Sequence, residues 1–265
     1  RDDTLTIWNL EVVPSLWFTS LTSDCKIFQE QATPDILSTV LSDCSEITVS
    51  KKLTESHSPW EYCVQYRETD FAFVSRLMEF EGMTYFFDHA ENDLTMVIAD
   101  SNSAFKECDD GEVDAVQDFS SPDEPGQLIT WKHDRSFRPG KVVQTDYNFE
   151  EPSTDLLVTS KGKSSYPAAS SAELFDYPGD YIEKSAGESL GKYRIEAAEV
   201  LADVASGTSS CRSFSPGYTF KIGDHPSSSE KGQKYLLTKV RHRASNEGVY
   251  GTVVDPTVAF QYENS

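Results

Sequence analysis

The sequence predicts an α+β protein that is rich in β-strands. Aromatic residues make up 12% of its 265 residues, with 15 Phe and 12 Tyr, and aromatic side chains favour strands. Two segments, 33–44 and 70–82, instead carry apolar residues at helical spacing between capping signals. In the second half, short strand candidates recur between turn-rich stretches. These three observations predict a first half that contains two helices and a second half that is mostly strands.

The formal net charge is −21, and the acidic residues are spread along the chain instead of forming a tail. Such a charge argues against nucleic acid and against stable insertion into an anionic membrane, while a basic or mixed-charge protein partner stays open. No window approaches the roughly 18 consecutive apolar residues of a membrane helix. The start RDDTLTIWNL has neither an apolar signal region nor an initiator methionine, so we expect a truncated or processed N-terminus.

The cysteines and histidines do not have the spacing of a chemical site. The five cysteines are Cys25, Cys44, Cys63, Cys108 and Cys211. Their odd number and the absence of a C-x-x-C pair favour a reducing compartment and ordinary buried thiols over a disulfide framework. No two of the five histidines have metal-ligand spacing, and H-E-x-x-H does not occur, so we expect no zinc, no other metal and no cofactor.

The first half predicts a compact α+β unit. The alternation at the start of the chain, with Leu5 and Ile7, is typical of a hairpin remnant. The first helix would have Thr33 as its N-cap and Pro34 at its first position. Its inward face would consist of Ile36, Leu37, Val40, Leu41 and Cys44.

A strand over 61–67 comes next, in which Tyr62, Val64 and Tyr66 alternate. A second helix follows, capped by Thr69 and closed by Gly82. Its inward face would consist of Phe71, Val74, Leu77 and Met78. A hairpin over 84–98 completes the unit.

From Phe105 the sequence becomes acidic and turn-rich, which predicts a domain boundary. The composition of 160–171 predicts a flexible loop. The strand candidates beyond the boundary are 127–133, 142–149, 218–223, 235–243 and 249–254. This half is interpreted as a β-barrel or sandwich with one inserted helix, 185–204.

A serine-hydrolase motif occurs at the start of that helix. Gly187-Glu188-Ser189-Leu190-Gly191 matches G-x-S-x-G, the turn that exposes a nucleophilic serine. Asp203, Asp224, His225 and His242 could supply the other members of a triad. Ser185 and Glu188, however, have the spacing of a capping box, so that Ser189 would lie inside a helix whose face continues through Leu190, Tyr193, Ala197 and Leu201. The preceding DYPGDYIEKSA lacks the buried strand that a nucleophile elbow needs, which makes the hydrolase the weaker alternative.

Several stretches resemble the VgrG family, the Rhs-element Vgr proteins at the tip of the type VI secretion system, which are related to phage baseplate hubs. The longest stretch is EYCVQYRETDFAFVSRLMEFEGMTYFFDH, 61–89, and the second is FDYPGDY, 175–181. SDCKIFQEQATPDIL, PGYTFKIGDHP and YLLTKVRHRA match in the family's order. The resemblance covers nearly the whole chain.

The resemblance implies a mechanical protein with phage-hub-like tube β-barrel domains and an α+β domain. It implies a homotrimer whose six barrel-like units seat on a hexameric Hcp-like tube and which carries effector or spike-tip proteins. Such a protein would be assembled in the bacterial cytoplasm and then secreted by the type VI apparatus. The family carries no catalytic site in the hub region, so no catalytic, cofactor or metal residue is assigned.

The resemblance also divides the chain. Residues 1–24 would be the incomplete end of the first tube barrel, 25–107 the α+β hub domain, and 108–265 the second barrel with the inserted helix. The sequence stops before the family's OB-fold and needle, so we expect a fragment or a hub-only relative that associates weakly by itself. A β-rich binding module is a further alternative, but the aromatics mostly fall on predicted core positions.

Two short runs predict turns instead of chemistry. Pro178 and Gly179 stand in the order of a type II turn within 176–180. Asp224, His225 and Pro226 could suggest an acid and base pair, but a Gly-Asp-His-Pro run between strands is more often a turn.

Overall fold

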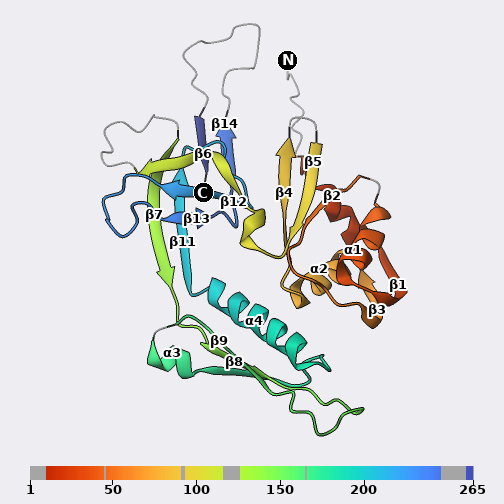
Figure 1. Ribbon diagram of the computed structural model, residues 1–265. Helices are drawn as coiled ribbons and strands as arrows, with labels where there is room; N and C mark the ends of the chain where they lie inside the picture. Colours follow the sequence, from red (N-terminus) through yellow and green to blue (C-terminus); the bar gives the residue numbers. More distant parts are fainter. Residues whose placement is uncertain are drawn as a thin grey trace, which may run out of the picture. The chain divides into compact units, whose positions relative to one another are not determined.

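The computed structural model describes residues 10–44, 46–90, 93–115, 126–164, 166–245 and 261–264. The chain divides into two compact units, Arg1–Ser101 and Asn102–Ser265 (Figure 1). The strand predicted at 249–254 and the alternation at Leu5 and Ile7 lie outside the described residues. The described elements confirm an α+β protein rich in strands. The assignment of 1–24, 25–107 and 108–265 to hub domains stays a prediction.

The first unit joins two small sheets to two α-helices. Its elements are η1 (Ser15–Ser20), β1 (Ser23–Gln31), α1 (Thr33–Ser42), β2 (Thr48–Lys52), β3 (Trp60–Thr69), α2 (Asp70–Phe80), β4 (Thr84–Ala90) and β5 (Asp93–Ala99). Strands β1 and β3 form an antiparallel pair. The other sheet has the order β2-β5-β4, with β2 parallel and β4 antiparallel to β5.

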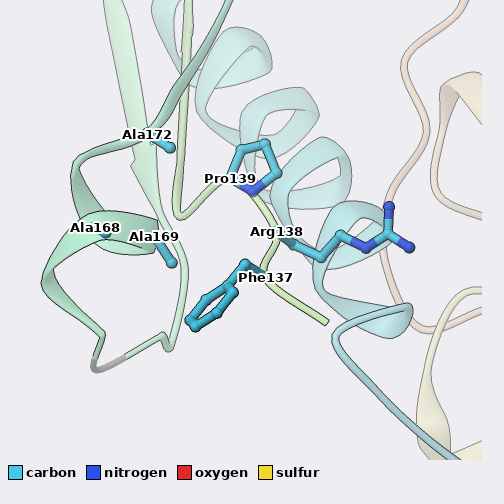
Figure 2. A pocket seen from close by; sticks show the side chains of 6 residues that line it. All are labelled: Phe137, Arg138, Pro139, Ala168, Ala169 and Ala172. Carbon is cyan, nitrogen blue, oxygen red and sulfur yellow. The ribbon is translucent and has the colours of Figure 1, made fainter. Parts of the chain in front are cut away.

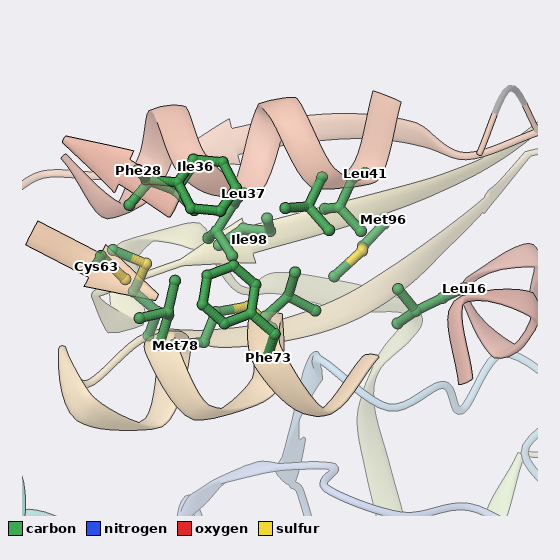
Figure 3. Close-up of a cluster of buried hydrophobic side chains, with 14 residues drawn as sticks. Leu16, Phe28, Ile36, Leu37, Leu41, Cys63, Phe73, Met78, Met96 and Ile98 are labelled. Carbon is green, nitrogen blue, oxygen red and sulfur yellow. The ribbon is translucent and has the colours of Figure 1, made fainter. Parts of the chain in front are cut away.

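The core of this unit lies where α1 and α2 meet the strands. Figure 3 shows Ile36 and Leu37 of α1 directed toward Phe73 of α2, with Ile98 of β5 beside them. Phe73 is fully buried, and its ring stacks on Phe28 of β1 at a centroid distance of 5.6 Å. The apolar face predicted for the first helix is confirmed at Ile36, Leu37, Val40 and Leu41, whereas Cys44 follows the helix and is only partly buried.

The ends of the helices confirm one predicted cap and correct another. The Ala72 backbone N–H donates to Thr69 Oγ1 at 3.1 Å, and Gly82 has a φ of 68°, as the capping signals predict for α2. For α1 the N-cap is Ala32, not Thr33. The hydroxyl of Thr33 instead donates to Glu81 Oε1 at 2.5 Å, in a buried contact.

The inward faces of β3 and α2 differ from the prediction. Tyr62 and Tyr66 are exposed, by 54% and 64%, while Cys63 and Gln65 are buried. The reason is that Cys63 lies opposite the buried Phe28, and Gln65 Nε2 donates to Asp70 Oδ1 at 2.7 Å inside the unit. In α2 the prediction held for the aliphatic positions, but Phe71 is only partly buried and Phe73 occupies the centre of the face.

A buried histidine joins three separate segments of the first unit. The His57 side chain is 6% exposed, with Nδ1 at 2.5 Å from Glu81 Oε2 and Nε2 at 3.4 Å from Asp100 Oδ2. Burial opposes ionisation of Asp100, but hydrogen bonds from the backbone N–H groups of Glu55 and Thr54 hold its pKa below the usual range.

The described residues of the second unit form two sheets and one long helix. Its elements are η2 (Asn102–Ala104), β6 (Lys106–Ala115), β7 (Gln127–Arg135), β8 (Lys141–Gln144), β9 (Val158–Lys161), α3 (Pro167–Ser171), β10 (Glu173–Asp176), α4 (Lys184–Val200), β11 (Asp203–Ser209), β12 (Tyr218–Ile222), β13 (Lys234–Leu236), β14 (His242–Ser245) and β15 (Gln261–Asn264). The larger sheet has the order β13-β12-β6-β7-β11-β15-β14. Its core contains Val113, Leu128, Phe214, Phe220 and Ile222.

The smaller sheet, β10-β8-β9, and helix α4 are inserted between β7 and β11 (Figure 1). Strands β7 and β11 are antiparallel neighbours, with Arg135 paired with Asp203 at the point where the insertion starts and ends. Helix α4 packs against β8 and β9. The predicted inserted helix is therefore confirmed, with the bounds Lys184–Val200.

Four other predictions for this half need correction. The acidic stretch after Phe105 is strand β6, because Cys108 and Val113 point inward from it while its carboxylates face solvent. The predicted strand 142–149 ends at Gln144, and 235–243 is split between β13 and β14. The predicted loop 160–171 contains the end of β9 and helix α3.

All five cysteines are free thiols. Burial is confirmed for Cys63, Cys108 and Cys211, and desolvation raises the pKa of Cys211 to about 11. Cys25 is exposed, contrary to the prediction, because it shares the outward face of β1 and β3 with Tyr66. No helix in the described part of the chain combines the length and apolar composition needed to span a membrane.

We predict that Phe73→Ala lowers the free energy of unfolding by about 3–5 kcal/mol, because it leaves a cavity at a fully buried aromatic position. Tyr66→Ala is the control, since its exposed side chain should contribute no more than about 0.5 kcal/mol. Urea denaturation of both variants measures the difference. Equal losses would contradict the observed faces of β3 and α2.

Candidate functional site

Ser189 does not occupy a nucleophile elbow. It lies within α4, on the solvent-exposed side, and the helix is preceded by the N-cap Glu183. The predicted capping box is wrong, because Ser185 is already inside the helix and no side chain caps the helix start. An elbow serine must stand on a sharp turn at the end of a strand, and a helical position cannot supply that geometry.

The residues considered as triad partners lie on other elements. Asp203 begins β11, beyond the C-terminus of α4. At a rise of 1.5 Å per residue, the helix extends for roughly 17 Å between Ser189 and its last residue, so Asp203 is far from the serine. Asp224 forms an ion pair with Lys231, and His225 Nδ1 accepts a hydrogen bond from the Ser227 backbone N–H at 3.0 Å. His242 begins β14 and pairs with Asn264 of β15. The structure therefore does not assemble the predicted hydrolase constellation.

The two glycines of the G-x-S-x-G match have a packing role. Gly187 and Gly191 are one helical turn apart on the buried face of α4. A Cβ at Gly187 would lie 2.5 Å from the Tyr181 ring, and a Cβ at Gly191 would lie 2.5 Å from Ser160 Oγ of β9. The glycines thus allow α4 to approach the small sheet closely, and Ser189 lies on the opposite side.

Tyr181 joins α4 to the small sheet. Its hydroxyl lies 2.7 Å from the Leu156 carbonyl oxygen and 3.0 Å from the Gln144 carbonyl oxygen, and burial raises its pKa. The Gln144 side chain is fully buried, and its Nε2 donates to the Gly187 carbonyl at 2.7 Å. This amide would be costly to bury without such a partner.

Arg194 completes the polar contacts between the helix and the sheet. Its Nη1 lies 2.7 Å from Gln144 Oε1 of β8 and 2.8 Å from Asp176 Oδ2 of β10. One guanidinium therefore connects α4 to two neighbouring strands. A charged donor makes stronger hydrogen bonds than a neutral one, which suits a contact at the edge of a small sheet.

The predicted type II turn within 176–180 is wrong. The Tyr177–Pro178 peptide bond is cis, and the residue with a left-handed backbone is Asp180, with a φ of 61°, instead of Gly179. A Cβ at Gly179 would lie 2.3 Å from the Tyr181 ring, so the glycine provides space for that ring. Asp146 Oδ2 accepts a hydrogen bond from the Asp180 backbone N–H at 2.7 Å and holds the segment in place.

A second polar cluster centres on His133 of β7. Its Nδ1 lies 2.8 Å from Asp203 Oδ1, and its Nε2 lies 3.0 Å from Glu230 Oε2. The same Glu230 oxygen accepts hydrogen bonds from Trp131 Nε1 at 2.9 Å and from the Tyr235 hydroxyl at 2.6 Å. The cluster joins β7, β11, the segment after β12, and β13.

The electrostatics of this cluster favour a charged imidazolium between two carboxylates. The hydrogen bond with Asp203 raises the pKa of His133, and Glu230 adds to this effect. Burial acts in the opposite direction but is outweighed. Hydrogen bonds, chiefly from Tyr235, lower the pKa of Glu230 to about 2. Burial and the neighbouring Glu230 raise the pKa of the Tyr235 hydroxyl. Both ring nitrogens have protein partners, so the histidine serves as a cross-link between strands.

Sequence reasoning missed this cluster. The only local signal is the alternation of Trp131, His133 and Arg135 along one face of β7, which does not identify Asp203 or Glu230 as partners. Within the described residues, no three His, Cys, Asp or Glu side chains are grouped as metal ligands would be.

A shallow apolar pocket of about 300 Å³ lies beside α3 (Figure 2). It is lined by Phe137, Arg138, Pro139, Ala168, Ala169 and Ala172. In Figure 2 the Arg138 side chain extends away from the alanines, while the Phe137 ring lies toward Ala169. The lining offers surface for packing, with no arrangement of acid, base and nucleophile.

We predict that Gly187→Ala destabilises the protein by about 1–3 kcal/mol, because the added methyl group overlaps the Tyr181 ring. The same substitution in an open helix position would stabilise the protein by about 1 kcal/mol. A decrease in the free energy of unfolding would therefore indicate the close contact with Tyr181, and an increase would indicate an open position. Ser189→Ala, on the exposed side of the same helix, is the control and should change stability by less than about 0.5 kcal/mol. Thermal and urea unfolding measure both effects.

A serine-hydrolase probe should leave the wild-type protein unlabelled. Stoichiometric labelling that Ser189→Ala abolishes would contradict the packing role of the motif and restore a catalytic one.

The His133 cluster predicts a specific pH dependence. A raised pKa in the folded state contributes stability that is present below the unfolded value near 6.5 and is lost as the pH rises through the folded value. The lowered pKa of Glu230 contributes stability that is present above 4.5 and is lost as the pH falls toward about 2. Urea midpoints of wild type should therefore decline as the pH rises above about 6.5, and His133→Gln should reduce that decline. Equal slopes in the two proteins would refute the charged cross-link.

The chain matches the family model "Phage tail baseplate hub (GPD)" over residues 1–248. It is 34% identical over 235 residues to the type VI secretion system spike protein VgrG1b of Pseudomonas aeruginosa, a match that covers 88% of this chain and 31% of that protein. VgrG1a of the same organism is 32% identical over 237 residues, with 88% and 36% coverage. The chain thus spans about a third of the length of these relatives.

Solved structures show the same fold. The E. coli c3393 protein, described as a component of the type VI secretion system similar to the T4 bacteriophage tail proteins gp27 and gp5, has a TM-score of 0.61 at 15% identity and is matched over 95% of this chain and 52% of its own. The tail protein from Neisseria meningitidis MC58 has a TM-score of 0.63 at 11% identity, with 94% and 70% coverage. The predicted resemblance is confirmed, and the chain belongs to the phage tail baseplate hub family, with similarity to the VgrG spike proteins.

Proposed function

We propose that this chain is a structural hub segment of a type VI secretion spike and performs no catalysis. The observation that carries the proposal is the hub-family match over residues 1–248 together with 34% identity to a VgrG spike protein. The exposed, helical position of Ser189 supports it, because the hydrolase motif then has a packing explanation. The connected hydrogen bonds of Tyr181, Gln144 and Arg194 also suit a part that bears mechanical load.

In this proposal three copies assemble around a closed axis. Residues 1–24 end a first tube barrel, 25–107 form the α+β hub domain, and 108–265 form a second barrel. Three copies of a longer parent protein that contains both barrels whole would give six units, which match a hexameric Hcp-like tube. The trimer would be assembled in the bacterial cytoplasm, carry effector or spike-tip proteins, and leave the cell through the type VI apparatus.

We predict that trimerisation is assisted by salt. Three chains of −21 bring together a formal charge of −63, and this repulsion reaches about 8 Å at physiological ionic strength but farther at low salt. Sedimentation of the parent protein and of this chain at about 10 mM and about 150 mM salt should show more trimer at the higher concentration, with weaker association of the chain alone. Circular dichroism at both salt concentrations controls for folding. A parent protein that is a stable dimer, or a monomer at every concentration, would overturn the hub proposal.

A further inference from the structure

Two neighbouring loops of the second unit expose large apolar side chains. The loops are 145–157, between β8 and β9, and 177–183, between β10 and α4, and we call them the tip loops. They meet at the end of the small sheet opposite α3 (Figure 1). The apolar side chains that are more than half exposed on them are Tyr147, Phe149, Tyr177 and Ile182.

The tip loops are held in one conformation by contacts with each other. Asp146 Oδ2 accepts from the backbone N–H groups of Asp180, at 2.7 Å, and Tyr181, at 3.3 Å. The buried Asn148 accepts from the Glu150 N–H at 2.9 Å and lies 3.5 Å from the Ile182 carbonyl. Exposed aromatics on a backbone fixed in this way lose little conformational entropy when a partner binds.

The charge around these side chains has one sign. The tip loops contain six carboxylates and no lysine or arginine. The carboxylates are Asp146, Glu150, Glu151, Asp155, Asp180 and Glu183. The neighbouring Lys184, the first residue of α4, lies 3.6 Å from Asp155 and offsets only one of them.

We propose that the tip loops form a docking surface for a protein face that presents arginine residues. Carboxylates accept bidentate hydrogen bonds from a guanidinium, and its flat face stacks on tyrosine and phenylalanine rings. Two copies that met at their tip loops would bring like charges together, because each set carries six carboxylates and no lysine or arginine, and nucleic acid has the wrong sign. The proposal goes beyond the hub role and does not depend on trimer assembly.

The test uses this chain and a fluorescent peptide of alternating arginine and leucine residues, with binding measured by anisotropy. Tyr147→Ala combined with Phe149→Ala should weaken binding by at least about tenfold, because it removes two stacking surfaces. Tyr62→Ala combined with Tyr66→Ala, which removes two exposed aromatics from the first unit, is the matched control and should change binding by less than about twofold.

A second set of variants separates local from overall charge. Glu150→Gln, Asp180→Asn and Glu183→Gln together should also weaken binding by about tenfold and reduce its dependence on salt. Glu61→Gln, Glu79→Gln and Glu196→Gln remove three exposed carboxylates outside the tip loops and should leave binding within about twofold. Melting curves of every variant confirm that it is folded.

Four outcomes of the binding measurements would overturn the proposal, and a fifth comes from self-association. These are equal losses in the test and control variants, equal binding of a lysine-leucine peptide, absence of binding at low salt, and binding to phosphatidylcholine vesicles in place of the peptide. Self-association of the chain that Tyr147→Ala and Phe149→Ala abolish would identify a second copy as the occupant and would also refute it. Because the peptide is measured against the chain alone, a failure of trimer assembly leaves the result interpretable.

Discussion

The arrangement of the small sheet and α4 depends on the contact between the Tyr181 ring and Gly187. The ring fits because the helix has no Cβ at that position, and the hydroxyl then reaches the backbone of Gln144 and Leu156. Displacing Tyr181 would leave the carbonyl oxygens of Gln144 and Leu156 without its hydroxyl as a donor, at about 1–3 kcal/mol for each group left unsatisfied. A van der Waals fit at one glycine therefore determines whether a hydrogen-bonded network can form.

Both units use a histidine between carboxylates to join segments that are distant in sequence. His57 lies between Glu81 and Asp100 in the first unit, and His133 lies between Asp203 and Glu230 in the second. Most ion pairs among the described residues are exposed and contribute little to stability. The partly or fully buried histidines are better placed, because their partners also receive hydrogen bonds from backbone or side-chain donors.

Local signals predicted the helices and the family, but not how faces and clusters form. The apolar spacing of α1 and α2 and the caps at Thr69 and Gly82 depend on neighbours within a few residues, so they could be predicted from the sequence. The outward direction of Tyr62 and Tyr66 could not be predicted, because it depends on the pairing of Cys63 with Phe28 from another strand. The His133 cluster likewise requires strand pairings that no local pattern encodes. For Ser189 the sequence predicted the helix, while the packing role of the two flanking glycines became apparent only with Tyr181 in place.

The small sheet and α4 leave the larger sheet and return to it at one pair of residues, Arg135 and Asp203 on neighbouring strands. An insertion whose two ends are already adjacent costs the host sheet little chain entropy, and each doubling of its length would add only about 0.6 kcal/mol. Its loops can therefore diverge among relatives, by substitution or by growth, while β7 and β11 keep the same register. This topology allows the insertion to change in length or sequence without a change in the register of the two strands that carry it.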